Sequence, residues 1–558
     1  MSNFRLSIFF LLALSFAQCS DDPEDKSPDS KTFSIQRITV DDKVHPAPLT
    51  GVSVNPDIRL NFSEPIDHES AEANILMGNG SGILTLNFTF TNNDSTIIVT
   101  PAEALEPLTT YNLGVSPELL SSTDKTFGGN IFITVVTTYN PESKFPILAD
   151  MDEDDDNTND LLSVIQHKTF KYFYDFAHPT SGMARERNSS GDMVTSGGSG
   201  FGIMSLIVGM ERNFINQQQG IDHMNKIVTF LEGADRFHGA WSHWINGNNG
   251  TVMSFSPNDN GGDLVETAFL LEGLITFRQY LVTKSIPDTY DLVDRINVLW
   301  HGVEWDWYRR ENQNVLYWHW SPDKDWIMNH QISGWNEALM VYVLAASSPT
   351  HTIPKAVYTN GWARNGGMVN GNTYEGVTLP LGFEYGGPLF FTHYSFLGLD
   401  PRELSDDYAN YWTQNVNHSR INYKYCVRNP KKYVGYGENC WGLTASDNNF
   451  SGYSAHSPTN DLGVISPTAA LSSFPYIPEE SMEAAKFFYY TLGDKLWGDY
   501  GFYDAFNLNS AWIANSYLAI DQGPIVVMIE NYRTGLLWDL FMSAPEVQAG
   551  LDKLGFTY

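Results

Sequence analysis

The stretch NHQISGWNEALMVYVLAA, from Asn329 to Ala346, is the strongest indication of fold class in this chain. It opens with polar residues and becomes apolar on every face of a helix from Ala338 onward. A helix that is apolar all round must be buried, so other elements have to pack around it. Glu337 stands at the start of the apolar run, where a carboxylate has to be paired, hydrogen-bonded or protonated. That environment suits a catalytic acid, and the alternative is a charge that only favours the helix N-terminus.

Length and charge limit the classes of function. The chain has 558 residues, of which 42% are hydrophobic and 14% aromatic, and its net charge is −32. This length predicts more than one domain. The negative charge repels phosphate backbones, which excludes a nucleic-acid partner, but it is compatible with a neutral polymer. Tyrosine and tryptophan suit stacking on sugar rings, although a large helical core also uses them.

The first residues resemble a targeting segment. Residues 1–19 combine the cation Arg5 with a short apolar run, and the end of the segment, Ser15-Phe16-Ala17-Gln18-Cys19, resembles a bacterial lipobox. We therefore expect lipidation of Cys19, with ordinary secretory cleavage as the alternative. The acidic run after Cys19 resembles a surface-export signal, so an outer-membrane lipoprotein facing outward is expected, and otherwise a periplasmic protein. Residues 20–32 are predicted to be a disordered tether.

Residues 33–138 have the pattern of a β-domain. Ile58–Phe62 alternates between apolar and polar residues, and turn signals separate it from similar short runs, which predicts a β-sandwich. The pieces NPDIRLNFSEPID (Asn55 to Asp67) and LTTYNLGV (Leu108 to Val115) resemble a bacterial Ig-like domain. We expect a spacer, with sugar binding as the alternative. Residues 139–160 are predicted to be an acidic linker.

From residue 161 to residue 558 the pattern changes to helix. Leu162–Phe173 follows helical spacing, and further helical stretches, among them Tyr290 to Tyr308 and Ile525 to Phe541, alternate with loops rich in glycine, asparagine and aromatic residues. About a dozen helices fit this length, and an array of helical hairpins closed into a toroid accounts for that number. The loops would then gather at one end, where function is usually found. The predicted fold class is therefore mainly α.

Acidic residues stand at the starts of three predicted helices. They are Asp259, Asp263 and Glu266 before LVETAFLLEGLITF, Glu337 in the central stretch, and Asp504 and Asp521 near the end. Asp263 with Glu266 also has the spacing of a capping box, a structural device worth about 1 kcal/mol. Glycoside hydrolysis needs two carboxyl groups whose pKa values are separated, so acids meeting at one end of the fold predict that chemistry. Glu530 and Arg533 are expected to pair with each other on one helix.

Five segments together resemble a known family: NDNGGDLVETAFLLEGL, SGWNEALMVYVLA, WGLTASD, GFYDAFN and AIDQGPIVVMIENYRTGLLW. They resemble the glycoamylase-like domain and, within it, glycoside hydrolase family 144, the β-1,2-glucanases, over residues 161–558. The resemblance implies an (α/α)6 toroid that hydrolyses β-1,2-glucan with inversion, either internally or by releasing the disaccharide sophorose.

The resemblance also implies roles for individual residues. Glu337 resembles the general acid, Asp521 resembles the partner that activates water, and Asp504 is the rival for that second role. Asp259, Asp263 and Glu266 resemble pocket acids. The residues expected to line the sugar subsites are Trp241, His243, Trp335, Tyr385 and Trp441.

Two alternatives to this function stay open. The chain could be a non-catalytic glycan-binding surface lipoprotein, or a hydrolase of another glucan linkage. In each case the partner is a polysaccharide or oligosaccharide, and the only link to a membrane is the lipid at Cys19. No cofactor and no metal are expected. The spacing of Cys426 and Cys440 allows a disulfide outside the cytoplasm but does not require one.

Overall fold

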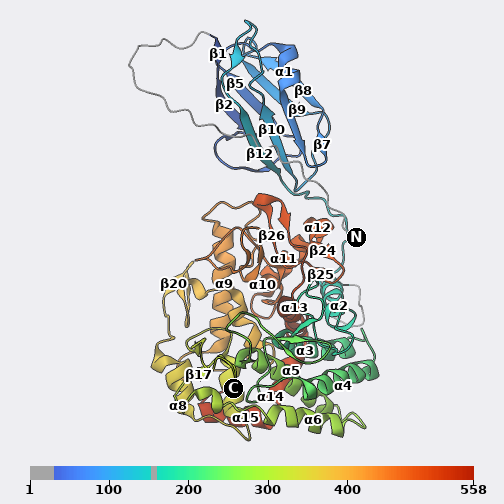
Figure 1. The fold of residues 1–558 in the computed structure, drawn as a ribbon, viewed down its shortest axis with the longest axis vertical. Helices are drawn as coiled ribbons and strands as arrows, with labels where there is room; N and C mark the ends of the chain where they lie inside the picture. The colour runs from blue at the N-terminus through green and yellow to red at the C-terminus, as the bar shows by residue number, and fades with distance from the viewer. Residues whose placement is uncertain (1–30, 152–159) are drawn as a thin grey trace. The chain divides into compact units, whose positions relative to one another are not determined.

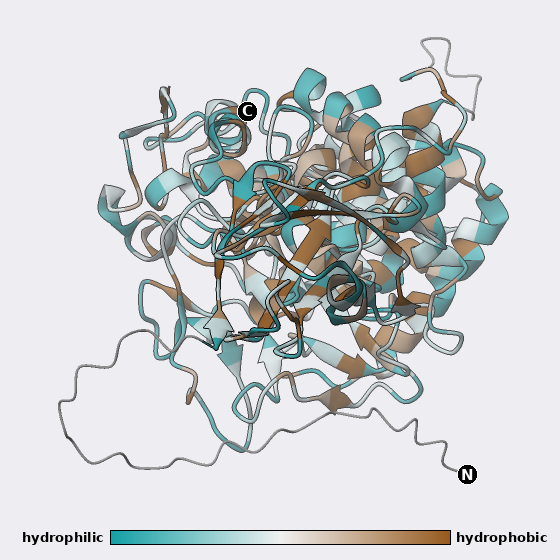
Figure 2. Cartoon of the chain, turned by 90° about the horizontal axis from the view of Figure 1, so that it is seen from above, coloured by the Kyte–Doolittle hydropathy of each residue, from teal (hydrophilic) through white to brown (hydrophobic). Residues whose placement is uncertain are grey.

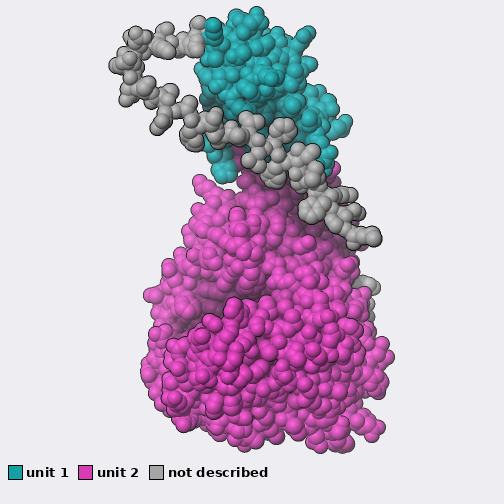
Figure 3. All heavy atoms as spheres, in the orientation of Figure 1, with its two compact units in different colours: residues 1–48, 55–103, 111–134 teal, residues 49–54, 104–110, 135–558 magenta. Residues whose placement is uncertain are grey.

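The computed structural model describes residues 31–151 and 160–558. The expected signal peptide with Cys19, nearly all of the tether and the acidic run Asp152–Asp156 lie outside the described residues. The chain divides into two compact units, one formed by residues 1–48, 55–103 and 111–134, the other by residues 49–54, 104–110 and 135–558 (Figure 3). Within the part of the chain that is described, no helix is both long and apolar enough to cross a membrane.

The β-domain is a sandwich of two five-stranded sheets, with strand orders β3-β2-β5-β9-β8 and β4-β12-β10-β6-β7. In β5 (Ile58–Phe62) the apolar residues Ile58, Leu60 and Phe62 are buried while Arg59 is exposed, which is the alternation expected of a sheet with one covered face. The predicted sandwich is therefore confirmed. The other strands of the two sheets are β2 (Ile35–Val40), β3 (Lys43–Val44), β4 (Leu49–Val52), β6 (Ile75–Asn79), β7 (Gly82–Ile83), β8 (Leu86–Thr91), β9 (Thr96–Pro101), β10 (Thr110–Val115) and β12 (Ile131–Thr137).

The larger unit is built mainly from helices, as predicted (Figure 1). Every residue of α7 (Leu339–Ser347) is buried, so the central prediction is confirmed. The remaining α-helices of this unit are α2 (Leu161–Tyr174), α3 (Ser196–Glu211), α4 (Gln217–Gly233), α5 (Leu264–Thr283), α6 (Tyr290–His301), α8 (Lys355–Val357), α9 (Tyr411–Arg428), α10 (Pro467–Leu471), α11 (Pro478–Lys486), α12 (Gly493–Leu496), α13 (Ala519–Arg533), α14 (Leu536–Met542) and α15 (Pro545–Leu554). That these helices close into an (α/α)6 toroid stays a prediction.

Helices α3, α5 and α13 form the centre of this unit, with α3 packed against both of the others. Glycines permit the close approach. A Cβ atom on Gly200 would lie 2.0 Å from the carbonyl oxygen of Phe269 in α5, and a Cβ atom on Gly523 would lie 2.4 Å from Cβ of Phe201. Hydrophobic segments, brown in Figure 2, gather in the interior around these helices. The first turns of the three helices are thereby held side by side.

Two of the predicted helical boundaries are wrong. The apolar run from Ile525 to Phe541 is not one helix, because α13 ends at Arg533 and α14 starts at Leu536. Gly535 between them has φ = 73°, a left-handed conformation that ends helices and that glycine adopts without strain. The helix predicted to continue to Tyr308 ends at His301, where α6 gives way to a loop.

Candidate active site

The first turns of α3, α5 and α13 bring distant acids together. The backbone N–H of Gly197, at the start of α3, donates to Oε2 of Glu266 in α5 at 2.9 Å. On the other side of α3, a Cβ atom on Gly198 would lie 2.7 Å from Cβ of Ala519, the first residue of α13. Asp521 belongs to that first turn of α13. The structure therefore places Glu266 and Asp521 on either side of one glycine-rich helix start.

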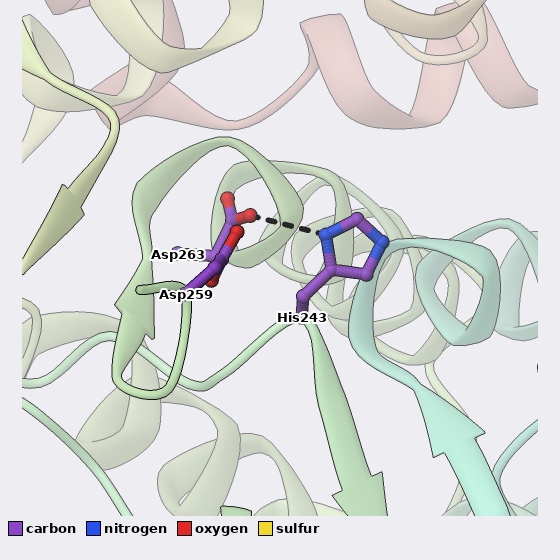
Figure 4. Close-up of side chains that lie close together, drawn as sticks. All are labelled: His243, Asp259 and Asp263. Carbon is purple, nitrogen blue, oxygen red and sulfur yellow. Dashed lines mark hydrogen bonds and ion pairs between the residues drawn. The ribbon is translucent and has the colours of Figure 1, made fainter. Parts of the chain in front are cut away.

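Asp263 anchors the first group of acids. It caps α5, because its Oδ1 accepts from the backbone N–H groups of Val265 and Glu266 at 2.9 Å. Its Oδ2 accepts from Nε1 of Trp318 at 3.1 Å and lies 3.2 Å from Nδ1 of His243. The predicted cap is confirmed, but Glu266 does not close a capping box, since its carboxylate binds Gly197 instead. Figure 4 shows Asp259 in the preceding loop and Asp263 facing the imidazole of His243.

The histidine of this group carries charge. Although burial opposes protonation, the carboxylates of Glu266, Asp263 and Asp259 raise the pKa of His243 to about 9. Burial and the neighbouring Asp263 in turn raise the pKa of Asp259 to about 7. His243, Asp259 and Asp263 each offer one atom within 4.8 Å of the others, a spacing compatible with a metal ion. A metal ion at these atoms would have to displace the proton of His243; without one, the group is an imidazolium among carboxylates.

Glu337 lies in the turn that leads into α7 and is half-buried. Its backbone carbonyl accepts from the hydroxyl of Ser395, and that hydroxyl also accepts from the N–H of Met340 at 2.9 Å, which fixes the turn. Burial, with the charges of Glu266 and Asp263 nearby, raises the pKa of Glu337 to about 7. A carboxyl group of that pKa still holds its proton near neutral pH, which is the property of a general acid.

Asp504 and Asp521, the two rivals for the second role, form a pair. Both are 4% exposed, and their carboxyl groups lie close enough to shift each other's pKa. One oxygen of each, Oδ1 of Asp504 and Oδ2 of Asp521, has no other partner. Burial and Asp447 raise the pKa of Asp504 to about 7, while burial and Asp504 raise the pKa of Asp521 well above its ordinary value. Two buried carboxyls this close share one proton, so the pair titrates as a unit.

Three residues that the sequence analysis missed hold this pair. The backbone N–H of Asp447 donates to Oδ2 of Asp504 at 2.7 Å. The side chain of Asp447 is itself bound by Nη1 of Arg187 at 3.1 Å and by Oγ of Ser516 at 2.6 Å. Asp447 closes the segment WGLTASD, which contributed to the family resemblance, so the signal was present without a role attached. Arg187 and Ser516 carried no signal in the sequence.

Tyr394 connects the two sides of the site. Its hydroxyl donates to Oδ1 of Asp521 at 3.4 Å, and its ring packs on Phe201 of α3 and Phe269 of α5. Burial and the charge of Asp521, with smaller effects from Glu337 and Glu266, raise the pKa of Tyr394 well above its ordinary value. Tyr394 therefore keeps its proton and lies within electrostatic reach of Asp521, Glu337 and Glu266. It was not predicted from the sequence.

Most of the predicted sugar-lining aromatics lie in the interior in this structure. Trp241, Trp335 and Trp441 are each at most 1% exposed and pack in the interior, because their indole rings fill space between helices. Tyr385 is half-buried on a loop and packs against Tyr374 at 4.7 Å. Of the five residues only His243 joins the acids. Aromatic side chains beside the acids that retain exposure include Trp318, which binds Asp263, and Phe255, which stacks on His243 at 4.3 Å.

Two further expectations concern buried polar groups. Glu530 and Arg533 do not pair with each other: Glu530 binds Arg212 at 2.8 Å, and Arg533 binds Asp160 at 3.0 Å. The (i, i+3) prediction fails because both side chains find partners on neighbouring helices. Cys426 and Cys440 are both buried free thiols in this structure.

Comparison with known proteins follows the same division of the chain. Residues 329–545 match the family model described as "Putative glucoamylase", and residues 35–133 match the bacterial Ig-like domain. An exo β-1,2-glucooligosaccharide sophorohydrolase (non-reducing end) from Parabacteroides distasonis is 47% identical over 416 residues, which cover 71% of this chain and 57% of that protein. This chain thus spans little more than half the length of that curated relative.

Solved structures extend the comparison. An endo-β-1,2-glucanase from Chitinophaga pinensis, determined with sophorotriose and glucose, is 54% identical with a TM-score of 0.70, covering 71% of this chain and 98% of its own. A β-1,2-glucanase from Parabacteroides distasonis is 38% identical with a TM-score of 0.69, covering 92% of this chain and 75% of its own.

Proposed function

The chain belongs to the glycoamylase-like family of glycoside hydrolases, and we propose that it hydrolyses β-1,2-glucan. One structural observation carries the proposal. Glu337, with a pKa of about 7, and the buried Asp504–Asp521 pair approach Tyr394 from different parts of the chain. Hydrolysis of a glycosidic bond needs one group that holds a proton and another that accepts one, and these two sets supply them.

We assign Glu337 as the general acid. Its proton passes to the glycosidic oxygen as the bond between that oxygen and the anomeric carbon breaks. Water attacks the anomeric carbon from the opposite face and loses its proton toward the Asp504–Asp521 pair. The hydroxyl of Tyr394, which donates to Asp521, can relay that proton by accepting from the water. The product then has the opposite anomeric configuration to the substrate. Glu337 recovers a proton from solvent, and the Asp504–Asp521 pair releases to solvent the proton that it accepted.

The first group of acids is suited to holding the sugar. Asp263 has both oxygens engaged and serves to position His243 and Trp318. Asp259 and Glu266 retain acceptor capacity for sugar hydroxyls, and the protonated His243 supplies a donor. Removing the imidazolium would leave the carboxylates repelling one another, so His243 is needed for the group to form.

A panel of substrates tests the proposal. Purified residues 20–558 are incubated with linear β-1,2-glucan, β-1,3-glucan and an α-1,4-glucan, and new reducing ends are measured. The proposal predicts product from β-1,2-glucan alone. Release from the α-1,4-glucan, or from none of the three, would contradict it. The relatives include both an exo-acting and an endo-acting enzyme, and the product sizes distinguish the modes: sophorose alone for exo action, a series of oligosaccharides for endo action.

We also propose that the protein is an outer-membrane lipoprotein anchored through Cys19. The lipobox-like end of residues 1–19 supports this, together with the acidic residues Asp21 and Asp22 that follow. Replacement of Cys19 by alanine is expected to move the protein from the membrane fraction to the soluble fraction. A variant that stays in the membrane fraction would refute the anchor, and protease accessibility of intact cells tests the outward orientation.

A further inference from the structure

We infer that a row of four tryptophans, Trp318, Trp320, Trp307 and Trp326, forms an additional binding surface for the glucan chain beyond the catalytic acids. The inference rests on the proposed function, because it takes the polymer to be the substrate of the acids. It concerns a part of the molecule that the reaction itself does not use. The four residues are named the tryptophan row below.

The outer end of the tryptophan row borders a cavity. A hollow of about 500 Å³ is lined by Trp307 and Trp326 together with polar residues, which are Glu304, Asp306, Arg310, Glu311, Asn312 and His351. Trp307 is 41% exposed, which is a large fraction for tryptophan, a large side chain that is highly buried on average. His238 stacks on one face of Trp307 at 3.7 Å, so the exposure belongs to the rest of the indole ring.

The inner end of the tryptophan row contacts Asp263, which belongs to the group of acids proposed to hold the sugar. Strand β18 (His319–Trp320) pairs with β16 (Gly262–Asp263), and Nε1 of Trp318 donates to Oδ2 of Asp263. Trp318 lies in the bend just before β18, two residues from Trp320 along the chain. Trp320 then contacts Trp307 at 5.9 Å, and Trp307 lies 6.4 Å from Trp326. With Trp318 joined to Trp320 along the chain, the tryptophan row therefore extends from Asp263 to the cavity.

The chemistry of the cavity suits a pyranose chain. Sugar rings present apolar C–H faces to aromatic rings and hydroxyls at their edges, and the cavity offers indoles beside carboxylate, amide and imidazole groups. The polar groups are held in place: Glu304 binds His238 at 2.9 Å, Asp306 binds His351 at 3.0 Å, and Arg310 binds Asn329 at 2.6 Å. A preformed set of this kind lowers the cost of ordering on binding.

The loop that rims the cavity is conformationally unusual. Arg310, Glu311 and Asn312 all have positive φ, of 42°, 62° and 61°, although none is glycine. Left-handed conformations of such residues cost energy and concentrate at functional sites. The guanidinium of Arg310 lies 5.4 Å from the ring of Tyr317 and 6.0 Å from that of Trp326, which ties this strained loop to the tryptophan row.

Kinetics on long and short substrates test the inference. Trp307→Ala is expected to raise KM for long linear β-1,2-glucan about tenfold, equivalent to about 1.4 kcal/mol, with kcat unchanged. Kinetics on the shortest oligosaccharide that is cleaved should not change, because such a substrate cannot span from the acids to the cavity. Tyr290→Ala is the matched control: Tyr290 is 83% exposed and starts α6, so its loss removes an exposed aromatic residue that does not line the cavity.

A second variant and a second measurement guard against misfolding. Trp307→Phe keeps an aromatic ring against His238 and should give a smaller rise in KM. Retardation in native gels containing the glucan measures binding without turnover, so it separates a failure of the tryptophan row from a failure of the proposed activity. The inference is overturned if Trp307→Ala, with an unfolding temperature equal to that of the wild type, shows unchanged KM and retardation. It is also overturned if long and short substrates are affected equally.

Discussion

Helix α13 carries a buried acid near each end, and the two are treated differently by their surroundings. Glu530, in the last turns, accepts hydrogen bonds from Nε and Nη2 of Arg212 at 2.8 and 2.9 Å, from Gln166 at 3.2 Å and from Thr534 at 2.9 Å. Asp521, in the first turn, has one long hydrogen bond from Tyr394 and a second carboxyl beside it, and no cation among the described residues is in contact with it.

The difference separates a structural acid from a functional one. A buried carboxylate that is fully paired contributes to holding helices in register and has no capacity left for a substrate. A buried carboxyl opposite another carboxyl keeps a labile proton and an unsatisfied oxygen, which is unfavourable for folding but useful for proton transfer. The same helix therefore gains stability at one end and gives some up at the other.

The largest expected effect is on catalysis at the first turn of α13. Asp521→Asn removes a proton acceptor from the pair, so kcat should fall about 10²- to 10⁴-fold. The unfolding temperature should stay equal or rise, because the substitution also relieves two carboxyls of their mutual repulsion. Enzyme kinetics and thermal unfolding on the same sample check both halves. A variant that loses stability and activity together would place Asp521 with Glu530 as a structural acid.

The opposite outcome is expected at the last turns of the helix. Glu530→Gln leaves Arg212 buried without its carboxylate, which should cost about 3–5 kcal/mol of unfolding free energy. The rate per folded molecule should stay close to that of the wild type. Urea unfolding and active-site titration measure the two quantities. Full stability of this variant would mean that the ion pair does not hold α13 to α3.

The pH dependence of the rate should follow the acids of the site and not those of the core. Glu337 acts when protonated, and its pKa is about 7, so kcat/KM should fall about tenfold per unit as pH rises above that value. The contribution of Asp504 to the free energy of unfolding should also fall as pH rises. Its pKa in the folded state, about 7, lies above its ordinary value of 3.8, so its contribution is present at low pH and is lost as pH rises toward 7.

A paired measurement sharpens this prediction. The gain in unfolding temperature of Asp504→Asn over the wild type should be larger at pH 8 than at pH 5. A rate that is flat between pH 6 and pH 9, or an Asp504→Asn variant that is equally stabilised at both pH values, would contradict the assigned protonation states.

The smallest effect is expected where α13 meets α2. Asp160 caps α2 through Ser163 and also binds Arg533 at 3.0 Å. Asp160→Asn keeps a side chain that can cap but loses the charge, so the cost should be about 1 kcal/mol with no change in kcat. Asp160→Ala loses the cap as well and should cost more. Equal stability of the two variants would show that the cap formed by Asp160 does not stabilise α2.

The acids could be predicted from sequence because each stands within a distinctive segment, and Asp263, Glu266, Glu337 and Asp521 also stand where an apolar helix starts. Asp504 and Asp521 were recognised as candidates, but their pairing depends on tertiary structure that no spacing encodes. The tryptophans failed for a related reason: residue type suggested sugar binding, whereas only packing shows that Trp241, Trp335 and Trp441 face inward. The pairing of Glu530 with Arg533 followed local helix geometry, and partners on neighbouring helices prevailed.

The central claim is that Glu337 donates a proton to the leaving oxygen of a β-1,2-glucan while water is activated by the Asp504–Asp521 pair. Proton NMR of the reaction of linear β-1,2-glucan with wild type and with Glu337→Gln tests it most directly. The account predicts that the wild type first releases the α-anomer of the product and that Glu337→Gln releases none. Initial release of the β-anomer, or turnover by Glu337→Gln at the wild-type rate, would contradict it.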